Sequence, residues 1–223
     1  YLDWVERQLT EGEIDLALSN IGFQHADCFQ LACLYWGRGD RTNAEKYLRM
    51  TLDRYERMRS AAKAHGRDLS ARKHNGEAYI KSAAVLLDAE LEGPILATAQ
   101  EAGYRPAFEN FLLDACLGTQ DFDMGAWQRL EDAWLKNRFP KYELDQWEVH
   151  VRALTGGFAD DAKMLNAHAR MWAGKAKRNP DAGMIDGYGE YNAYVVDHIF
   201  AAVLRRIGWE GTYRHSWPNT CPA

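Results

Sequence analysis

The sequence is poor in the residues and segments that mark several classes of protein. Its 223 residues include only four cysteines, too few and too scattered for a disulfide scaffold. No apolar run approaches the roughly 20 residues that a membrane span needs. No basic-then-apolar signal segment opens the chain. We therefore expect a cytoplasmic protein that does not enter a membrane, or a periplasmic one if a signal segment has been removed.

The motifs of common catalytic centres are also missing. The chain has five serines, no Gly-x-Ser-x-Gly turn and no glycine-rich phosphate loop. Its seven histidines include no pair at i and i+4 and no His-Glu-x-x-His motif. The cysteines lie in apolar helical contexts, where burial raises the pKa of a thiol and makes it inert. We predict no catalytic residue, no metal site and no cofactor from these patterns.

Apolar residues recur at helical spacing along nearly the whole chain, which predicts an all-α protein. Because most connections are short, successive helices should pack as antiparallel hairpins in an irregular bundle of about nine or ten helices. We expect one domain over residues 1–223, with a candidate subdivision at the basic stretch 66–75. The expected helices are 14–20, 26–38, 41–65, 76–92, 94–103, 106–117, 123–138, 141–155, 159–178 and 186–207.

One predicted hairpin, residues 31–48, is more specific. Paired aromatics, Tyr35 and Trp36, end its first helix, and Gly39 and Asp40 make the turn. Ala44 is small where the two helices cross. This stretch resembles the middle of a tetratricopeptide repeat, and a partial copy of its Gly-to-Ala spacing returns at 157–162. The likeness implies a tetratricopeptide-like helical fold rather than a regular solenoid.

Charge is distributed in blocks along the sequence. Residues 1–37 carry a net charge of −5, 38–74 carry +6, 75–161 carry −9 and 162–223 carry +3. Within the acidic block, six carboxylates cluster at hairpin ends and helix starts. If these share a face, it would suit a partner with a basic surface. The candidate partner-binding residues are Asp121, Asp123, Glu131, Asp132, Asp160 and Asp161.

Two other patterns suggest alternative sites. The basic stretch between Arg38 and Lys73 contains interspersed acids, so we interpret it as a solvated helix face and predict no direct nucleic-acid binding. His168, Tyr194 and His198 lie on apolar helices and are candidate pocket residues. The simpler interpretation is that both histidines are core or boundary residues with hydrogen-bond partners.

The layout as a whole resembles helical immunity proteins that protect bacteria from polymorphic toxins, including those delivered by type VI secretion. The resemblance rests on the hairpin at 31–48, the irregular hairpins after it, and the closing helix of residues 191–208, which a short proline-bearing tail follows. It implies a non-enzymatic protein that binds a cognate protein toxin and occludes its active surface. A basic toxin surface, such as a nuclease active site, would match the acidic block.

Three functions from different classes therefore compete at this point. The first is an immunity protein that neutralises a toxin. The second is a tetratricopeptide-like scaffold that binds other proteins or self-associates, for example as a homodimer. The third is a small all-helical enzyme, which requires titratable groups such as His168, Tyr194 and His198 to converge in a pocket.

Overall fold

The structure, a computed structural model, describes residues 2–67, 77–91, 104–118, 121–137, 144–157, 165–170 and 197–209. These residues are helical apart from turns and caps, and they contain no strand, which confirms the predicted all-α class. The helices are α1 (Leu2–Thr10), α2 (Ile14–Gly37), α3 (Arg41–Ala64), α4 (Glu77–Leu87), α5 (Tyr104–Leu117), α6 (Met124–Lys136), η2 (Asp145–Trp147), α7 (Glu148–Leu154) and α9 (His198–Arg206). A further helical segment covers residues 165–170. None of the described helices is long and apolar enough to cross a membrane.

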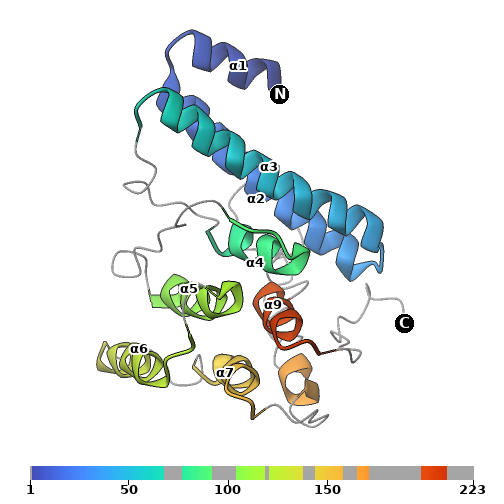
Figure 1. Cartoon of the computed structure of the whole chain (residues 1–223), viewed down its shortest axis with the longest axis vertical. Helices are drawn as coiled ribbons and strands as arrows, with labels where there is room; N and C mark the ends of the chain where they lie inside the picture. The colour runs from blue at the N-terminus through green and yellow to red at the C-terminus, as the bar shows by residue number, and fades with distance from the viewer. Residues whose placement is uncertain are drawn as a thin grey trace.

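The N-terminal half is built on the long antiparallel hairpin of α2 and α3 (Figure 1). Its turn forms where the sequence predicts it, because Gly39 adopts a φ of +77°, which glycine reaches without strain. The Asp40 side chain then accepts a hydrogen bond from the Asn43 backbone N–H and caps α3. Ala44 and Leu48 are buried between the two helices. The hairpin expected at 31–48 is confirmed.

Several helix boundaries differ from the sequence-based prediction. The closing helix, expected over 186–207, begins only at His198, because Asp197 has non-helical backbone angles and is its N-cap. The break expected between residues 20 and 26 is wrong, because α2 is continuous across it: Ile21 and His25 are buried, and Gly22 faces Met58 of α3. Helix α1 was not predicted, although its Val5 is buried beneath the hairpin. Helix α4 ends at Leu87 rather than 92, because Asp88 has a φ of +51°. The helix expected at 94–103 lies outside the described residues.

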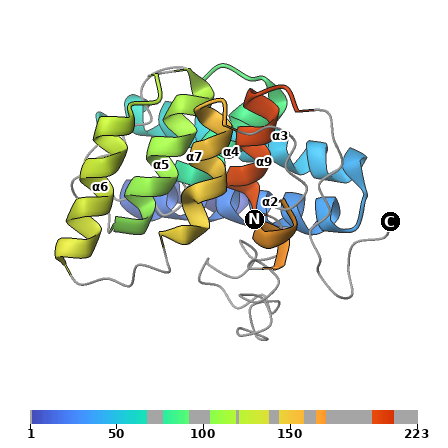
Figure 2. The same cartoon turned by 90° about the horizontal axis from the view of Figure 1, so that it is seen from below.

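Helix α9 occupies the centre of the C-terminal half. It packs against α4, α5 and α7, and its Phe200 and Val203 are completely buried (Figures 1 and 2). The central position predicted for the closing helix is confirmed over 198–206. An aromatic core joins this helix to its neighbours, with Phe108 of α5 in ring contact with Trp127 and Trp134 of α6 and with Trp147 of η2.

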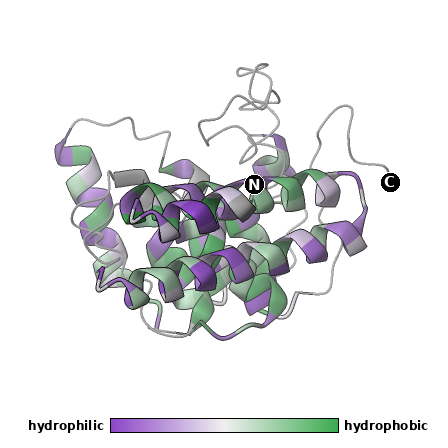
Figure 3. Ribbon diagram, turned by 90° about the horizontal axis from the view of Figure 1, so that it is seen from above, coloured by the Kyte–Doolittle hydropathy of each residue, from purple (hydrophilic) through white to green (hydrophobic). Residues whose placement is uncertain are grey.

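Hydrophilic and hydrophobic segments alternate along the ribbons, as expected for amphipathic helices that bury one face (Figure 3). Helix α6 lies at the edge of the bundle, next to α5 (Figure 2). It buries Trp127 and Trp134 toward the core and leaves its outer side to solvent. The architecture therefore offers two places for function: the buried polar groups around α9, and the free side of an edge helix.

Candidate functional site

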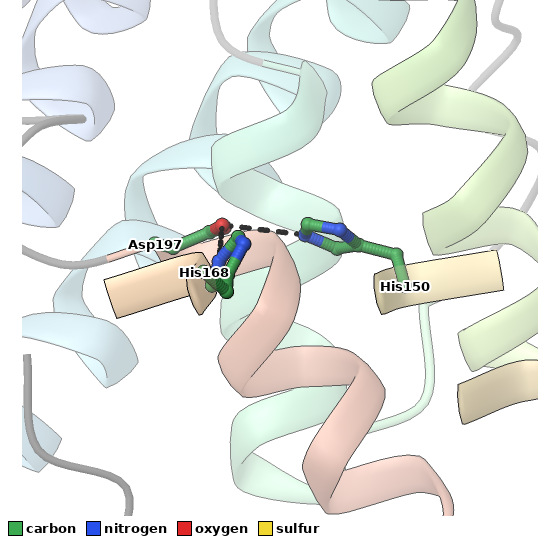
Figure 4. A group of neighbouring side chains, drawn as sticks. All are labelled: His150, His168 and Asp197. Atoms are coloured by element: carbon green, nitrogen blue, oxygen red, sulfur yellow. Dashed lines mark hydrogen bonds and ion pairs between the residues drawn. The ribbon is translucent and has the colours of Figure 1, made fainter. Parts of the chain in front are cut away.

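Three polar side chains meet inside the C-terminal half. His150 comes from α7, His168 from the helical segment 165–170, and Asp197 from the residue that precedes α9 (Figure 4). The Nε2 atoms of His168 and His150 lie 2.9 Å and 3.3 Å from the same carboxylate oxygen, Oδ2 of Asp197. All three side chains are no more than 2% exposed. We call this group the His–Asp cluster.

Local helix chemistry holds Asp197 in place. Its other oxygen, Oδ1, accepts a hydrogen bond of 2.9 Å from the backbone N–H of Phe200, which is the N-cap contact that begins α9. Oδ2 is therefore left for the two histidines. The capping bond also fixes the rotamer of the side chain, because the helix start and the carboxylate move together. The cluster is thus anchored to the central helix of this half of the protein.

The surroundings of the His–Asp cluster are aromatic. The ring centroid of Phe200 lies 4.7 Å from that of His168 and 5.2 Å from that of His150. The ring centroids of Trp147 and His150 are 5.3 Å apart. Burial by itself raises the pKa of the Asp197 carboxyl. The charge of His150 and the hydrogen bonds of His150 and His168 outweigh it and hold this pKa well below its usual range. Asp197 is therefore ionised in the folded protein.

His198 is adjacent to Asp197 in sequence but makes a different set of contacts. Its Nδ1 lies 2.9 Å from Oγ of Ser82 in α4, and its ring packs edge-on against Phe29 and Tyr79. Two consecutive residues thus tie α9 to both halves of the bundle. The interpretation of His168 and His198 as buried histidines with partners is confirmed. His168 bonds to Asp197 and His198 to Ser82, and Tyr194, the third candidate pocket residue, lies outside the described residues.

The donor set of the His–Asp cluster is one that metal ions use. Two imidazole nitrogens and one carboxylate oxygen, each from a different element, lie within 4.8 Å of one another. Nitrogen and oxygen ligands of this kind suit zinc and other divalent transition metals. No such group was expected from the sequence. His150 was not singled out, and the three positions are 18 and 29 residues apart, so no spacing rule applies to them.

A second buried polar group lies between α4 and α5. Nζ of Lys81 lies 2.6 Å from Oδ1 of Asp114, and the Lys81 side chain is only 1% exposed. Glu77 is one turn earlier on α4, and Asn110 donates a hydrogen bond of 3.4 Å to it. Burial raises the pKa of Glu77, and repulsion from Asp114 adds to this, while Lys81 and Asn110 lower it. This group joins two helices through charge.

The acidic candidates have unequal roles in the structure. Asp123 caps α6 by accepting hydrogen bonds from the N–H groups of Gly125 and Ala126, at 2.8 Å and 3.1 Å. Glu131 is half-buried and accepts a hydrogen bond of 2.8 Å from the indole of Trp127. Asp121 and Asp132 are exposed. Asp160 and Asp161 lie outside the described residues.

The free side of α6 combines these acids with apolar side chains. Met124 and Leu135 are 47% and 44% exposed. They are eleven residues apart, about three helical turns, and therefore lie on the same side of the helix. We call the surface formed by Asp121, Met124, Gln128, Asp132 and Leu135 the α6 face.

The described cysteines are buried, and burial raises their pKa, as the sequence predicted. Burial raises the pKa of the thiols of both Cys33 and Cys116 to about 12 and also raises that of Cys28. Thiol chemistry at these positions is therefore suppressed at neutral pH.

No protein-family model, curated protein or solved structure matches this chain.

Proposed function

We propose that this protein is an immunity-type inhibitor that binds a cognate bacterial protein toxin through the α6 face and blocks the toxin's active surface. The observation that carries the proposal is the exposure of Met124 and Leu135 on the same edge helix as the exposed Asp132, with the exposed Asp121 in the segment just before that helix. Large apolar side chains that remain this exposed on a folded helix are suited to contact with a protein partner.

Charge adds the second part of the argument. Asp121 and Asp132 lie within the acidic block 75–161, whose net charge is −9. A basic partner would be steered toward this edge, and the apolar side chains would then supply contact area at the centre of the interface. Such a division of roles, with charges governing encounter and apolar anchors governing dissociation, is suited to an inhibitor that must capture a toxin quickly and hold it.

The first experiment is to co-express the chain with the product of its neighbouring gene. We expect the chain to protect cells from killing and to form a stable one-to-one complex in size-exclusion chromatography with light scattering. Absence of both protection and binding would refute the proposal and favour the scaffold hypothesis.

The second experiment tests the surface. Asp121→Lys combined with Asp132→Lys reverses two exposed charges and spares Asp123 and Glu131, which hold α6 together. The matched control is Asp53→Lys with Glu90→Lys, the same charge change at exposed positions on other parts of the bundle. We expect the first double variant to bind the toxin about 10- to 100-fold more weakly, since like charges then face each other. If the control pair weakens binding equally, the α6 face is not the docking surface.

A tetratricopeptide-like scaffold is the second candidate, and one observation favours it. Phe23 and Leu16 of α2 are 52% and 48% exposed and are seven residues apart, so they form a stripe along the outside of the hairpin. A scaffold would bind its partner here rather than at α6. Replacing both residues with Ser, which should leave the buried side of α2 intact, would abolish binding under the scaffold hypothesis and leave toxin binding unchanged under the proposed one.

A further inference from the structure

We propose that His150, His168 and Asp197 form a zinc site that links three elements of the C-terminal half. The proposal concerns the inside of the protein and does not depend on the toxin-binding function. Its basis is the convergence of three ligand-type atoms on one point in the described core, shown in Figure 4.

The spacing of the ligand atoms fits the ion. Zinc binds imidazole nitrogen and carboxylate oxygen at about 2.0–2.2 Å in a tetrahedral arrangement. Two ligands at that bond length are separated by about 3.3 Å across a tetrahedral edge. The distances from Oδ2 of Asp197 to the Nε2 atoms of His150 and His168 are 3.3 Å and 2.9 Å. The ligand nitrogens of His150 and His168 lie within 4.8 Å of each other, so both rings would have to move slightly to bring all three atoms to one ion. Water would fill the fourth position.

The carboxylate is already prepared as a ligand. Because Oδ1 is held by the N–H of Phe200, Oδ2 is the oxygen that faces the two imidazoles and would bind a metal through one oxygen. Supporting hydrogen bonds of this kind orient metal ligands and raise affinity. The site would therefore be assembled as part of the N-cap of α9 and would need no reorganisation of the helix.

Charge balance also favours a cation. Asp197 is only 1% exposed, and the ion pairs that it makes with described residues are those with His150 and His168. A divalent cation bound to two neutral imidazoles would compensate the buried carboxylate directly. Since the side chains are no more than 2% exposed, a substrate would have no access to the ion. The expected role is structural, as a cross-link between α7, the segment 165–170 and α9.

The test begins with the full chain, purified without a polyhistidine tag and without chelator. We expect elemental analysis to find about one zinc ion per chain. Cobalt(II) added to the chelator-treated protein should give the intense visible absorption of tetrahedral coordination. Chelator should lower the melting temperature, and zinc sulfate should restore it, because a ligand that binds only the folded state stabilises it.

The variants His150→Gln, His168→Gln and Asp197→Asn should each reduce zinc affinity at least about tenfold. The matched control is His198→Gln. His198 is a buried histidine next to Asp197 at the start of α9, but it bonds to Ser82 and not to the His–Asp cluster. It should retain zinc. If the cluster variants fail to fold, the cobalt spectrum and the chelator melt of the unaltered chain still decide the matter. Protein without zinc, without a tetrahedral cobalt spectrum and without a melting shift would refute the proposal and leave a hydrogen-bonded cluster.

Discussion

The ion pair between α4 and α5 permits a quantitative prediction about stability. Lys81 is 1% exposed and lies 2.6 Å from Asp114, which is 24% exposed. Removing one partner of a buried pair leaves the other charge without compensation, which costs about 3–5 kcal/mol when both are fully buried. The two partners differ in exposure here, so the two single variants should differ in their effect.

Asp114→Asn leaves the ammonium of Lys81 in the core without its closest carboxylate, although Glu77, one turn earlier on α4, still interacts with it. Because Glu77 remains as a partial counter-charge, we expect a loss of about 2–4 kcal/mol in the free energy of unfolding. Lys81→Met should lose less, about 1–2 kcal/mol, because Asp114 can be hydrated and a flexible apolar side chain fills the space. The double variant should lie within about 1 kcal/mol of the unaltered protein, since it leaves neither charge of the pair.

The assay is urea unfolding followed by tryptophan fluorescence and by far-ultraviolet circular dichroism, whose midpoints must coincide for a two-state analysis. The four proteins form a double-mutant cycle that isolates the coupling between the two side chains. A smaller loss for Asp114→Asn than for Lys81→Met would contradict the reasoning from exposure. Additive single effects would show that the pair is not coupled.

Two further predictions concern carboxylates at the start of α4 and at the start of α6. Glu77→Gln should raise the melting temperature at pH 7, because burial raises the pKa of Glu77 and disfavours its ionised form in the folded state. The gain should vanish below about pH 4.5, where the carboxyl is protonated in both the folded and the unfolded state. A gain in melting temperature that persists there would contradict this account. Asp123→Ala should lose about 1 kcal/mol through loss of the α6 cap, whereas Asp121→Ala, at an exposed position that caps nothing, should change stability by less than about 0.5 kcal/mol in the same thermal melts.

The turn of the α2–α3 hairpin could be predicted from the sequence because the residues that form it are close together in the chain. Gly39 supplies the positive φ, Asp40 the cap, and Ala44 the close approach, all within six residues. The same local reasoning introduced a break near Gly22, where glycine is unfavourable in an isolated helix. Burial of Ile21 and His25 on either side of Gly22 keeps the helix continuous, and the identity of the distant residues that cover them is not encoded in the local pattern.

The candidate sites divide in the same way. Asp123 and Asp132 were identified as a group from charge and position, but only the fold separates the capping residue from the exposed one. The central place of α9 follows from its apolar composition. That Asp197 and His198, neighbours in sequence, bond to different parts of the bundle follows from the direction in which each side chain leaves the start of the helix.

The sequence alone therefore determined the helical class, the turn chemistry and the acidic character of the chain, because each depends on residues a few positions apart. Only the tertiary structure joined His150 and His168 to Asp197 and exposed one side of α6. Contacts between residues far apart in the chain depend on how whole helices pack, and helical periodicity specifies which side of a helix is buried without specifying the partner that covers it.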